Sequence, residues 1–117
     1  MSNNRNNLTT GITELLVLSI LSENDSYVYE ITKKISDNSN NLLSISQNTI
    51  YTVVYKLEEN NFVHEYSKLV GKKRTRIYYH IEQSGREYLQ KLTENYQNMV
   101  AGVQKIWDSL ERGKTNE

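Results

Sequence analysis

The strongest constraint on the fold is a repeat of apolar residues toward the C-terminal end of the chain. The residues of this repeat alternate at intervals of three and four positions and are Leu89, Leu92, Tyr96, Met99, Val103, Ile106 and Leu110. Three consecutive heptads of this kind predict one long helix with an apolar stripe about 30 Å long at 1.5 Å per residue. The stripe packs either against a second copy of the chain or against the core of its own domain. We expect a homodimer, with Trp107 beside Ile106 in the same contact.

Length and composition limit the rest of the molecule. A chain of 117 residues has room for one domain with a modest core. The absence of cysteine and proline excludes disulfides and thiolate chemistry, and it favours a cytoplasmic setting. The longest apolar run, residues 15–21, is far shorter than the roughly 20 residues of a membrane-spanning helix. We therefore expect no association with a membrane.

Upstream of the long helix, the pattern predicts three short helices and then a β-hairpin. Apolar residues recur at helical spacing from Thr10, from Val28 and from Gln47, and Ser46 is suited to cap the third of these helices. Asn60 and Asn61 are suited to the left-handed conformation that ends it. After Asn61 the residues become β-branched and aromatic on both sides of the basic stretch KLVGKKRTR, which is typical of a hairpin. The last helix is expected to begin at a capping box of Ser84 and Glu87.

This order of elements predicts a mainly α fold with a small β-hairpin, namely a winged helix-turn-helix with an appended dimerisation helix. The expected divisions are a flexible tail at residues 1–8, a DNA-binding domain at residues 9–82, the dimerisation helix at residues 83–112 and a second flexible tail at residues 113–117.

The third helix is predicted to present an outer face that is polar but uncharged. The residues of this face are Gln47, Asn48, Thr49, Tyr51, Thr52 and Tyr55. Amides, hydroxyls and rings match the donors, acceptors and methyl groups on base edges in the major groove, whereas a carboxylate would be repelled by the phosphates. The first carboxylate of the helix is Glu58, at its far end. The pattern therefore favours a recognition helix.

Local charge in the hairpin supports the same interpretation. The chain as a whole has 14 basic and 14 acidic residues, so its net charge is zero. Nevertheless, the hairpin places five bases within nine residues: Lys68, Lys72, Lys73, Arg74 and Arg76. Such a loop is either an ordinary solvated turn or a phosphate-binding wing. Because it follows the recognition helix directly, we expect residues 72, 73, 74 and 76 to bind double-stranded DNA.

These segments together resemble the short PadR-type transcriptional regulators over about residues 10–110. The resemblance rests on GITELLVLSILSE, YVYEITKKI, TIYTVVYKLEENNFV and RIYYHIEQSGREYL. The positions that match the family motifs are Thr49, Ile50 and Tyr51 in the third helix, Arg76, Tyr78 and Tyr79 at the end of the wing, and Gly85 at the start of the last helix. The resemblance implies a dimeric repressor that binds a two-fold symmetric operator.

Two departures from the usual family pattern are similar to its small multidrug-sensing (LmrR-like) branch. Tyr27, Val28 and Tyr29 replace a common His-Gly-Tyr, and Thr52 replaces a common proline. In that branch an aromatic residue near the middle of the last helix lines a flat pore at the dimer centre, and Tyr96 matches its position. The resemblance thus implies a small aromatic ligand, and the expected lining is Leu15, Leu89, Thr93, Tyr96 and Val100. The alternative is that Tyr96 is ordinary seam packing.

The sequence contains no pattern typical of an enzyme. It has no phosphate-binding glycine loop and no nucleophile elbow, and His64 and His80 have no further ligand at metal-binding spacing. We expect no cofactor and no metal. Two hypotheses remain: a ligand-responsive homodimeric repressor, or an adaptor that keeps the winged-helix fold but binds another protein without recognising an operator directly.

Overall fold

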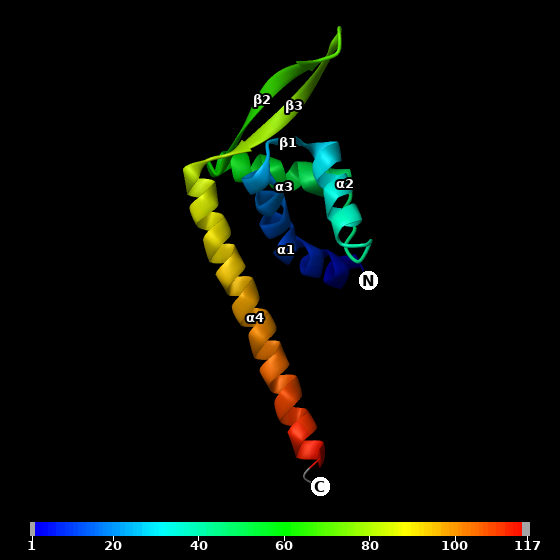
Figure 1. The fold of residues 1–117 in the computed structure, drawn as a ribbon, viewed down its shortest axis with the longest axis vertical. Coiled ribbons are helices and arrows are strands. Elements are labelled where there is room, and N and C mark those ends of the chain that lie inside the picture. Colours follow the sequence, from blue (N-terminus) through cyan, green and yellow to red (C-terminus); the bar gives the residue numbers. More distant parts are fainter. Residues whose placement is uncertain (1, 116–117) are drawn as a thin grey trace.

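The computed structural model describes the backbone of residues 2–115 and the side chains of residues 12–114. The elements, in chain order, are α1 (Ser2–Glu23), β1 (Ser26–Tyr27), α2 (Val28–Asn38), α3 (Gln47–Glu59), β2 (Val63–Val70), β3 (Arg74–Ile81) and α4 (Gln83–Thr115). The molecule measures 71 × 28 × 24 Å, because the β2–β3 hairpin and α4 extend from the body in opposite directions (Figure 1). The predicted winged-helix architecture is confirmed.

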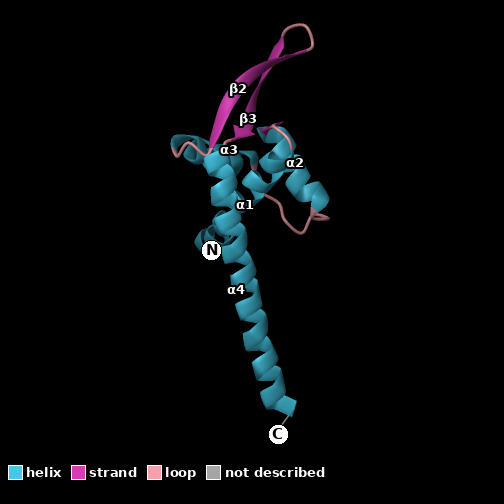
Figure 2. Ribbon diagram, turned by 60° about the vertical axis from the view of Figure 1, so that its left-hand side comes forward, coloured by secondary structure: helices cyan, strands magenta, loops and turns pink. Residues whose placement is uncertain are grey.

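The core lies where α1, α2 and α3 meet the base of the sheet (Figure 2). Its buried apolar residues include Val17, Leu18 and Leu21 of α1, Val28, Ile31 and Ile35 of α2, Ile50, Val53, Val54 and Leu57 of α3, and Val63, Tyr79 and Ile81 of the sheet. α2 and α3 each contribute one stripe at three- and four-residue spacing, as amphipathic helices on a shared core do, whereas α1 is apolar on more than one side. Within the described part of the chain, none of the helices is long and apolar enough to span a bilayer.

The boundaries of α3 follow from its own sequence. At its start, Ser46 Oγ accepts a hydrogen bond from the backbone N–H of Thr49 (3.2 Å), which is the predicted N-cap. At its end, Asn61 adopts φ +61°, a left-handed conformation that asparagine tolerates better than most residues. Phe62 follows in the turn to β2. The cap at Ser46 and the left-handed Asn61 therefore agree with the prediction, whereas Asn60, with φ −90°, does not adopt that conformation.

The sheet has one strand more than the predicted hairpin. β2 and β3 pair antiparallel from Val63 opposite Ile81 to Val70 opposite Arg74. Gly71, at φ +69°, turns the chain between them, a conformation open to glycine. The additional strand β1 pairs with β3 through Ser26 opposite Tyr79 and Tyr27 opposite Tyr78. A two-residue strand between two helices carries no periodic signal of its own, which is why the sequence did not indicate it.

The start of α4 differs from the predicted capping box. The helix begins at Gln83, and the hydroxyl of Ser84 donates to the carbonyl oxygen of Asn61 (2.7 Å) instead of capping the helix. The prediction was wrong because the helix begins one residue earlier, so Ser84 lies inside its first turn, where its hydroxyl reaches the turn after α3. Gly85 is buried in the same contact, where a Cβ atom would collide with the carbonyl oxygen of Phe62.

Both ends of the described chain are more helical than expected. α1 begins at Ser2, within the segment 1–8 that was expected to be a flexible tail, and α4 continues to Thr115, within the expected tail 113–117. Adding a residue to a helix that has already formed is far easier than starting one, so a helix can extend into polar sequence. Residues 1, 116 and 117 lie outside the described part.

Candidate nucleic-acid interface

The outer face of α3 is open to solvent. Gln47, Asn48, Tyr51, Thr52 and Tyr55 are exposed and Thr49 is half-buried, whereas the opposite stripe of the helix is in the core. The rings of Tyr51 and Tyr55 are neighbours, with centroids 6.1 Å apart. The six residues predicted to recognise bases therefore lie on one side of one helix.

Hydrogen bonds within α3 distinguish these six side chains. The Thr52 hydroxyl donates to the carbonyl oxygen of Asn48 (3.1 Å), and the hydroxyls of Thr49 and Ser46 are 3.0 Å apart. Both threonine hydroxyls are thus partly occupied by the helix itself. The exposed amides of Gln47 and Asn48 and the phenols of Tyr51 and Tyr55 are better placed to form hydrogen bonds with a partner.

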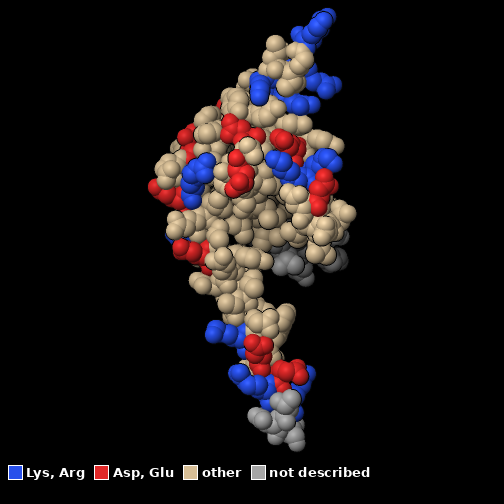
Figure 3. Space-filling view, viewed as in Figure 1, with Lys and Arg blue, Asp and Glu red and all other residues tan. Residues whose placement is uncertain are grey.

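The basic residues of the hairpin form two groups. Lys72, Lys73 and Arg74 are exposed at its end, where Lys and Arg gather at the tip of the molecule (Figure 3). Nearer the body, Lys68 Nζ lies 5.3 Å from the centroid of the Tyr78 ring, and the Arg76 guanidinium lies 4.3 Å from that of Tyr27. Cation–π contacts of this kind hold a side chain in place without neutralising its charge. The tip therefore offers exposed charges, and the strands just below it offer charges held by aromatic rings.

The pleat of the hairpin divides its residues between two faces. Alternate residues of a strand point to opposite sides, so Glu65 and Ile77 share the face of buried Tyr79, toward α3. The basic residues Lys68 and Arg76 start from the other face, but the Arg76 guanidinium reaches the ring of Tyr27 in β1, at the edge of the sheet. The sequence analysis did not include Glu65 in the site, although the period of two after buried Val63 was a usable signal. An acidic side chain thus lies beside the expected DNA-binding helix.

A hydrogen-bond network attaches the hairpin to the turn before β1. Asp25 accepts hydrogen bonds from the Tyr66 hydroxyl (2.6 Å) and from Nδ1 of His80 (2.8 Å). Desolvation by burial acts to raise the pKa of Asp25, but the two hydrogen bonds and the nearby histidines outweigh it, so the pKa is lowered. The hydrogen bond to Asp25 raises the pKa of Tyr66 to about 12.

The second histidine has a carboxylate of its own. Nδ1 of His64 contacts Glu82, and the His64 and His80 rings are 5.1 Å apart. Even so, no group of three or more His, Cys, Asp or Glu side chains among the described residues is arranged to hold a metal ion.

A second set of contacts joins α4 to α1 and α3. The Tyr88 hydroxyl of α4 donates to Glu14 of α1 (2.6 Å), and this hydrogen bond raises the pKa of Tyr88 to about 12. Glu14 also lies 4.0 Å from Lys56 Nζ of α3. The Tyr88 ring stacks on Phe62, with centroids 4.3 Å apart and planes 10° from parallel. The base of α4 therefore contacts both the helix and the turn that position the candidate recognition face.

The predicted seam of α4 divides into two parts. Leu89 and Leu92 are half-buried against the core of their own domain. Beyond them the seam residues are exposed, from Tyr96 at 43% and Met99 at 56% to Val103 at 39% and Ile106, Trp107 and Leu110 at 61% each. Of the residues predicted to line a ligand site, Leu15, Leu89 and Thr93 are half-buried, whereas Tyr96 and Val100 are exposed.

Comparisons with known proteins agree with this geometry. Residues 17–91 match the model of the transcriptional regulator PadR-like family. A transcriptional regulator from Clostridium thermocellum is 30% identical, with a TM-score of 0.77 over 85% of this chain and 93% of that one. The protein smu.1704 from Streptococcus mutans UA159 is 31% identical, with a TM-score of 0.73 over 84% and 88% of the two chains.

Bacillus subtilis PadR in complex with operator DNA shares the fold, with a TM-score of 0.63 and 21% identity over 68% of this chain and 46% of that one. The family match covers all the elements from the middle of α1 to the anchored base of α4. The chain therefore belongs to the PadR-like family of transcriptional regulators.

Proposed function

We propose that this regulator is a homodimeric repressor that binds a two-fold symmetric operator in double-stranded DNA. The observation that carries the proposal is the exposed, uncharged polar face of α3 next to the cationic tip of the hairpin, in a member of the PadR-like family. The complex of Bacillus subtilis PadR with operator DNA supports it by analogy of fold. Residues 9–82 bind DNA in this proposal and residues 83–112 form the dimer.

The roles of the two DNA-binding surfaces differ. Gln47, Asn48, Thr49 and Tyr51, at the N-terminal end of α3, contact base edges in the major groove, with Thr52 and Tyr55 beside them. The basic residues at the tip are Lys72, Lys73 and Arg74. Together with Arg76 they bind phosphates and add affinity that does not depend on the DNA sequence. Acting on chromosomal DNA, the dimer works in the cytoplasm.

The dimer uses the exposed part of the α4 seam. Below the body, α4 has a stretch without charged atoms on the face in view in Figure 3, and the heptad residues from Tyr96 to Leu110 are open to solvent. A contiguous apolar stripe of this length on an isolated chain marks an interface. A second copy offers the same stripe, so a two-fold contact covers both at once. Trp107 packs in the same contact.

The proposal includes a flat aromatic effector at the centre of this dimer. Leu89, Thr93, Tyr96 and Val100 share one face of α4, and Leu15 is on α1, which packs against the base of α4. Two phenol rings facing each other across a two-fold axis suit an offset-stacked aromatic guest. A guest that prefers one spacing of the two α4 helices shifts the spacing of the two α3 helices and so alters DNA affinity. Tyr88, through Glu14 and Phe62, is the contact that transmits the shift.

DNA binding is tested by footprinting on the DNA upstream of the protein's own gene, followed by titrations of two alanine variants at several salt concentrations. Asn48→Ala is expected to cost roughly 1–3 kcal/mol on the protected site and little on random DNA. Arg74→Ala is expected to weaken both DNAs by similar factors and to flatten the salt slope by about one unit. Equal effects of both variants on both DNAs would contradict the division of roles. No protected site and no salt dependence would favour the protein-binding adaptor instead.

The effector site is tested by titrating a planar dye of the Hoechst or acridine type against the DNA-free protein and its Tyr96→Ala variant. We expect saturable binding that the substitution abolishes. Lys91→Ala, an exposed position on another side of α4, is the control and should bind like the unaltered protein. If Tyr96→Ala leaves dye binding unchanged, Tyr96 only packs in the dimer seam and does not bind the effector.

A further inference from the structure

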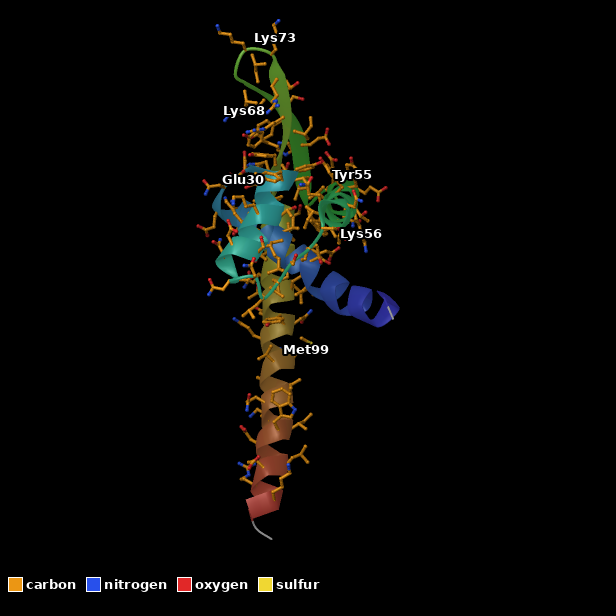
Figure 4. The ribbon with its side chains drawn as sticks, turned by 90° about the vertical axis from the view of Figure 1, so that its right-hand side faces the viewer. Glu30, Tyr55, Lys56, Lys68, Lys73 and Met99 are labelled. Carbon is orange, nitrogen blue, oxygen red and sulfur yellow. The ribbon has the colours of Figure 1, made fainter. Side chains whose placement is uncertain are left out.

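A hollow of about 380 Å³ lies between α3, the end of β1 with the start of α2, and the hairpin. It is lined mainly by aromatic and polar side chains, among them Tyr29, Tyr51, Tyr55, Glu65, Arg76 and Tyr79. Figure 4 shows Tyr55 on the side of α3 nearest the hairpin and Lys56 on the other side. The hollow is thus formed within one chain, and its volume falls within the roughly 300–1,000 Å³ of small-molecule sites.

The lining already binds a cation of the protein itself. Tyr27 also lines the hollow, and the guanidinium of Arg76 lies over its ring, 4.3 Å from the centroid. The negative face of an aromatic ring attracts positive charge, and several rings around one space add their attraction. Tyr51 and Tyr55 offer two further rings, and both are exposed.

Two carboxylates lie at the hollow, one in its lining and one beside it. Glu65 lines it, and the Glu58 carboxylate is held close by, accepting a hydrogen bond from the backbone N–H of Glu65 (3.1 Å). The pKa of Tyr79 is raised, first by burial and then by the negative charges of Glu65 and Glu58, among others. Among the described lining residues Arg76 is the only base. Rings and carboxylates together favour a positive guest over a phosphate.

We propose that this hollow binds a small organic cation with an apolar body, such as an aromatic quaternary ammonium ion. The cation lies over the rings of Tyr51 and Tyr55 with its charge toward Glu65. The site is separate from the proposed dimer centre, because it is formed by α3, β1, the start of α2 and the hairpin and includes no residue of α4. The consequence for regulation rests on the proposed function. A bound cation excludes operator DNA directly, because it occupies the space beside the base-reading face of α3.

The experiment titrates (4-hydroxyphenyl)trimethylammonium and its neutral isostere 4-tert-butylphenol into the intact protein without DNA. Binding is measured by NMR from the chemical shifts of the backbone amides. The cation is expected to bind saturably, to shift amides of α3 and β3, and to bind at least about three- to tenfold more tightly than the isostere. Glu65→Gln keeps the shape of an exposed side chain and removes its charge. It should therefore weaken binding of the cation by a similar factor and leave the affinity for the isostere unchanged. Tyr55→Leu should weaken both ligands.

Tyr96→Ala separates this site from the dimer centre, and we expect it to leave cation binding unchanged. Equal affinity for the two probes, insensitivity to Glu65→Gln, or loss of binding in Tyr96→Ala would each overturn the proposal. DNA binding in the absence of any probe is measured in parallel. Failure of the cation to bind a protein that still binds its operator contradicts this site alone, whereas the absence of operator binding contradicts the proposed function.

Discussion

The two halves of α4 share one spacing of apolar residues but have different surroundings. Near its start, Gly85, Tyr88, Leu89 and Leu92 contact the turn after α3, Glu14 and the core. From Tyr96 onward, equally apolar residues at the same spacing are exposed. The heptad repeat runs through both halves without a break. The difference teaches that a heptad pattern identifies a face that must be covered, but not what covers it.

The comparison also separates two kinds of stability. Contacts in the first half of α4 are formed within one chain, so they stabilise the body at any concentration. The exposed half gains burial only when a partner is present, and its contribution therefore depends on concentration. Substitutions in the two halves should be distinguishable by that dependence alone.

The largest effect is expected from Met99→Glu with Val103→Glu in the exposed half. Two carboxylates in an apolar dimer contact cost several kcal/mol, so the dissociation constant should rise more than about a hundredfold. Analytical ultracentrifugation is the measurement. Gln97→Glu with Gln104→Glu, which adds the same charge off the seam, should leave the dimer intact. A double seam variant that sediments as a folded dimer would place the interface elsewhere.

Gly85→Ala in the anchored half should show the largest loss of stability within one chain. The new methyl group collides with the Phe62 carbonyl, and overpacking of this kind costs about 1–3 kcal/mol of the free energy of unfolding. Gly102→Ala is the matched control, because nothing lies within 4 Å of its Cβ position and alanine favours a helix. Urea denaturation of both, made in the monomeric Met99→Glu, Val103→Glu protein, should show Gly85→Ala destabilised and Gly102→Ala not. Equal effects would mean that α4 does not approach Phe62 so closely.

Tyr88→Phe should cost less, because it removes only the hydroxyl that donates to Glu14. A hydrogen bond to a charged group contributes about 1.5–3 kcal/mol, and the remaining access of Glu14 to water reduces the loss to about 1–2 kcal/mol. Tyr96→Phe removes the same hydroxyl from an exposed ring and should change the free energy of unfolding by less than about 0.5 kcal/mol. If the two variants are alike in urea denaturation, the Tyr88–Glu14 bond does not hold α4 to α1.

What the sequence predicted correctly was local or periodic. The N-cap at Ser46, the left-handed Asn61 and the exposed face of α3 depend on residues within one or two turns of each other. Strand β1 and the bonds of Asp25 were missed because they join positions far apart in the chain, 55 residues in the case of His80.

Glu65 and the start of α4 show the same limit at the site. Glu65 lies beside Tyr51 and Tyr55 only because the hairpin folds back over α3. Ser84 lies inside the first turn of α4, and its hydroxyl donates to a carbonyl 23 residues upstream. Spacing along the chain indicated which residues share an element. Which elements then meet depended on tertiary packing, which no local pattern contains.

The smallest expected effect concerns pH and the hairpin anchor, which belongs entirely to the body. Because the folded-state pKa of Asp25 lies below its usual value of 3.8, its charged form contributes stability above that value, and this stability is lost as the pH falls through the folded-state pKa. Asp25→Asn removes the titration, so its free energy of unfolding should fall less steeply than that of the unaltered protein below about pH 5. Asp108→Asn, on exposed α4, is the control for losing a carboxylate. The difference should persist in the monomeric double seam variant, because Tyr66 and His80 hold Asp25 within one chain. If the difference between Asp25→Asn and the unaltered protein appears only in the dimer, the pH dependence comes from association and not from the anchor. The body and the exposed half of α4 would then not be independent.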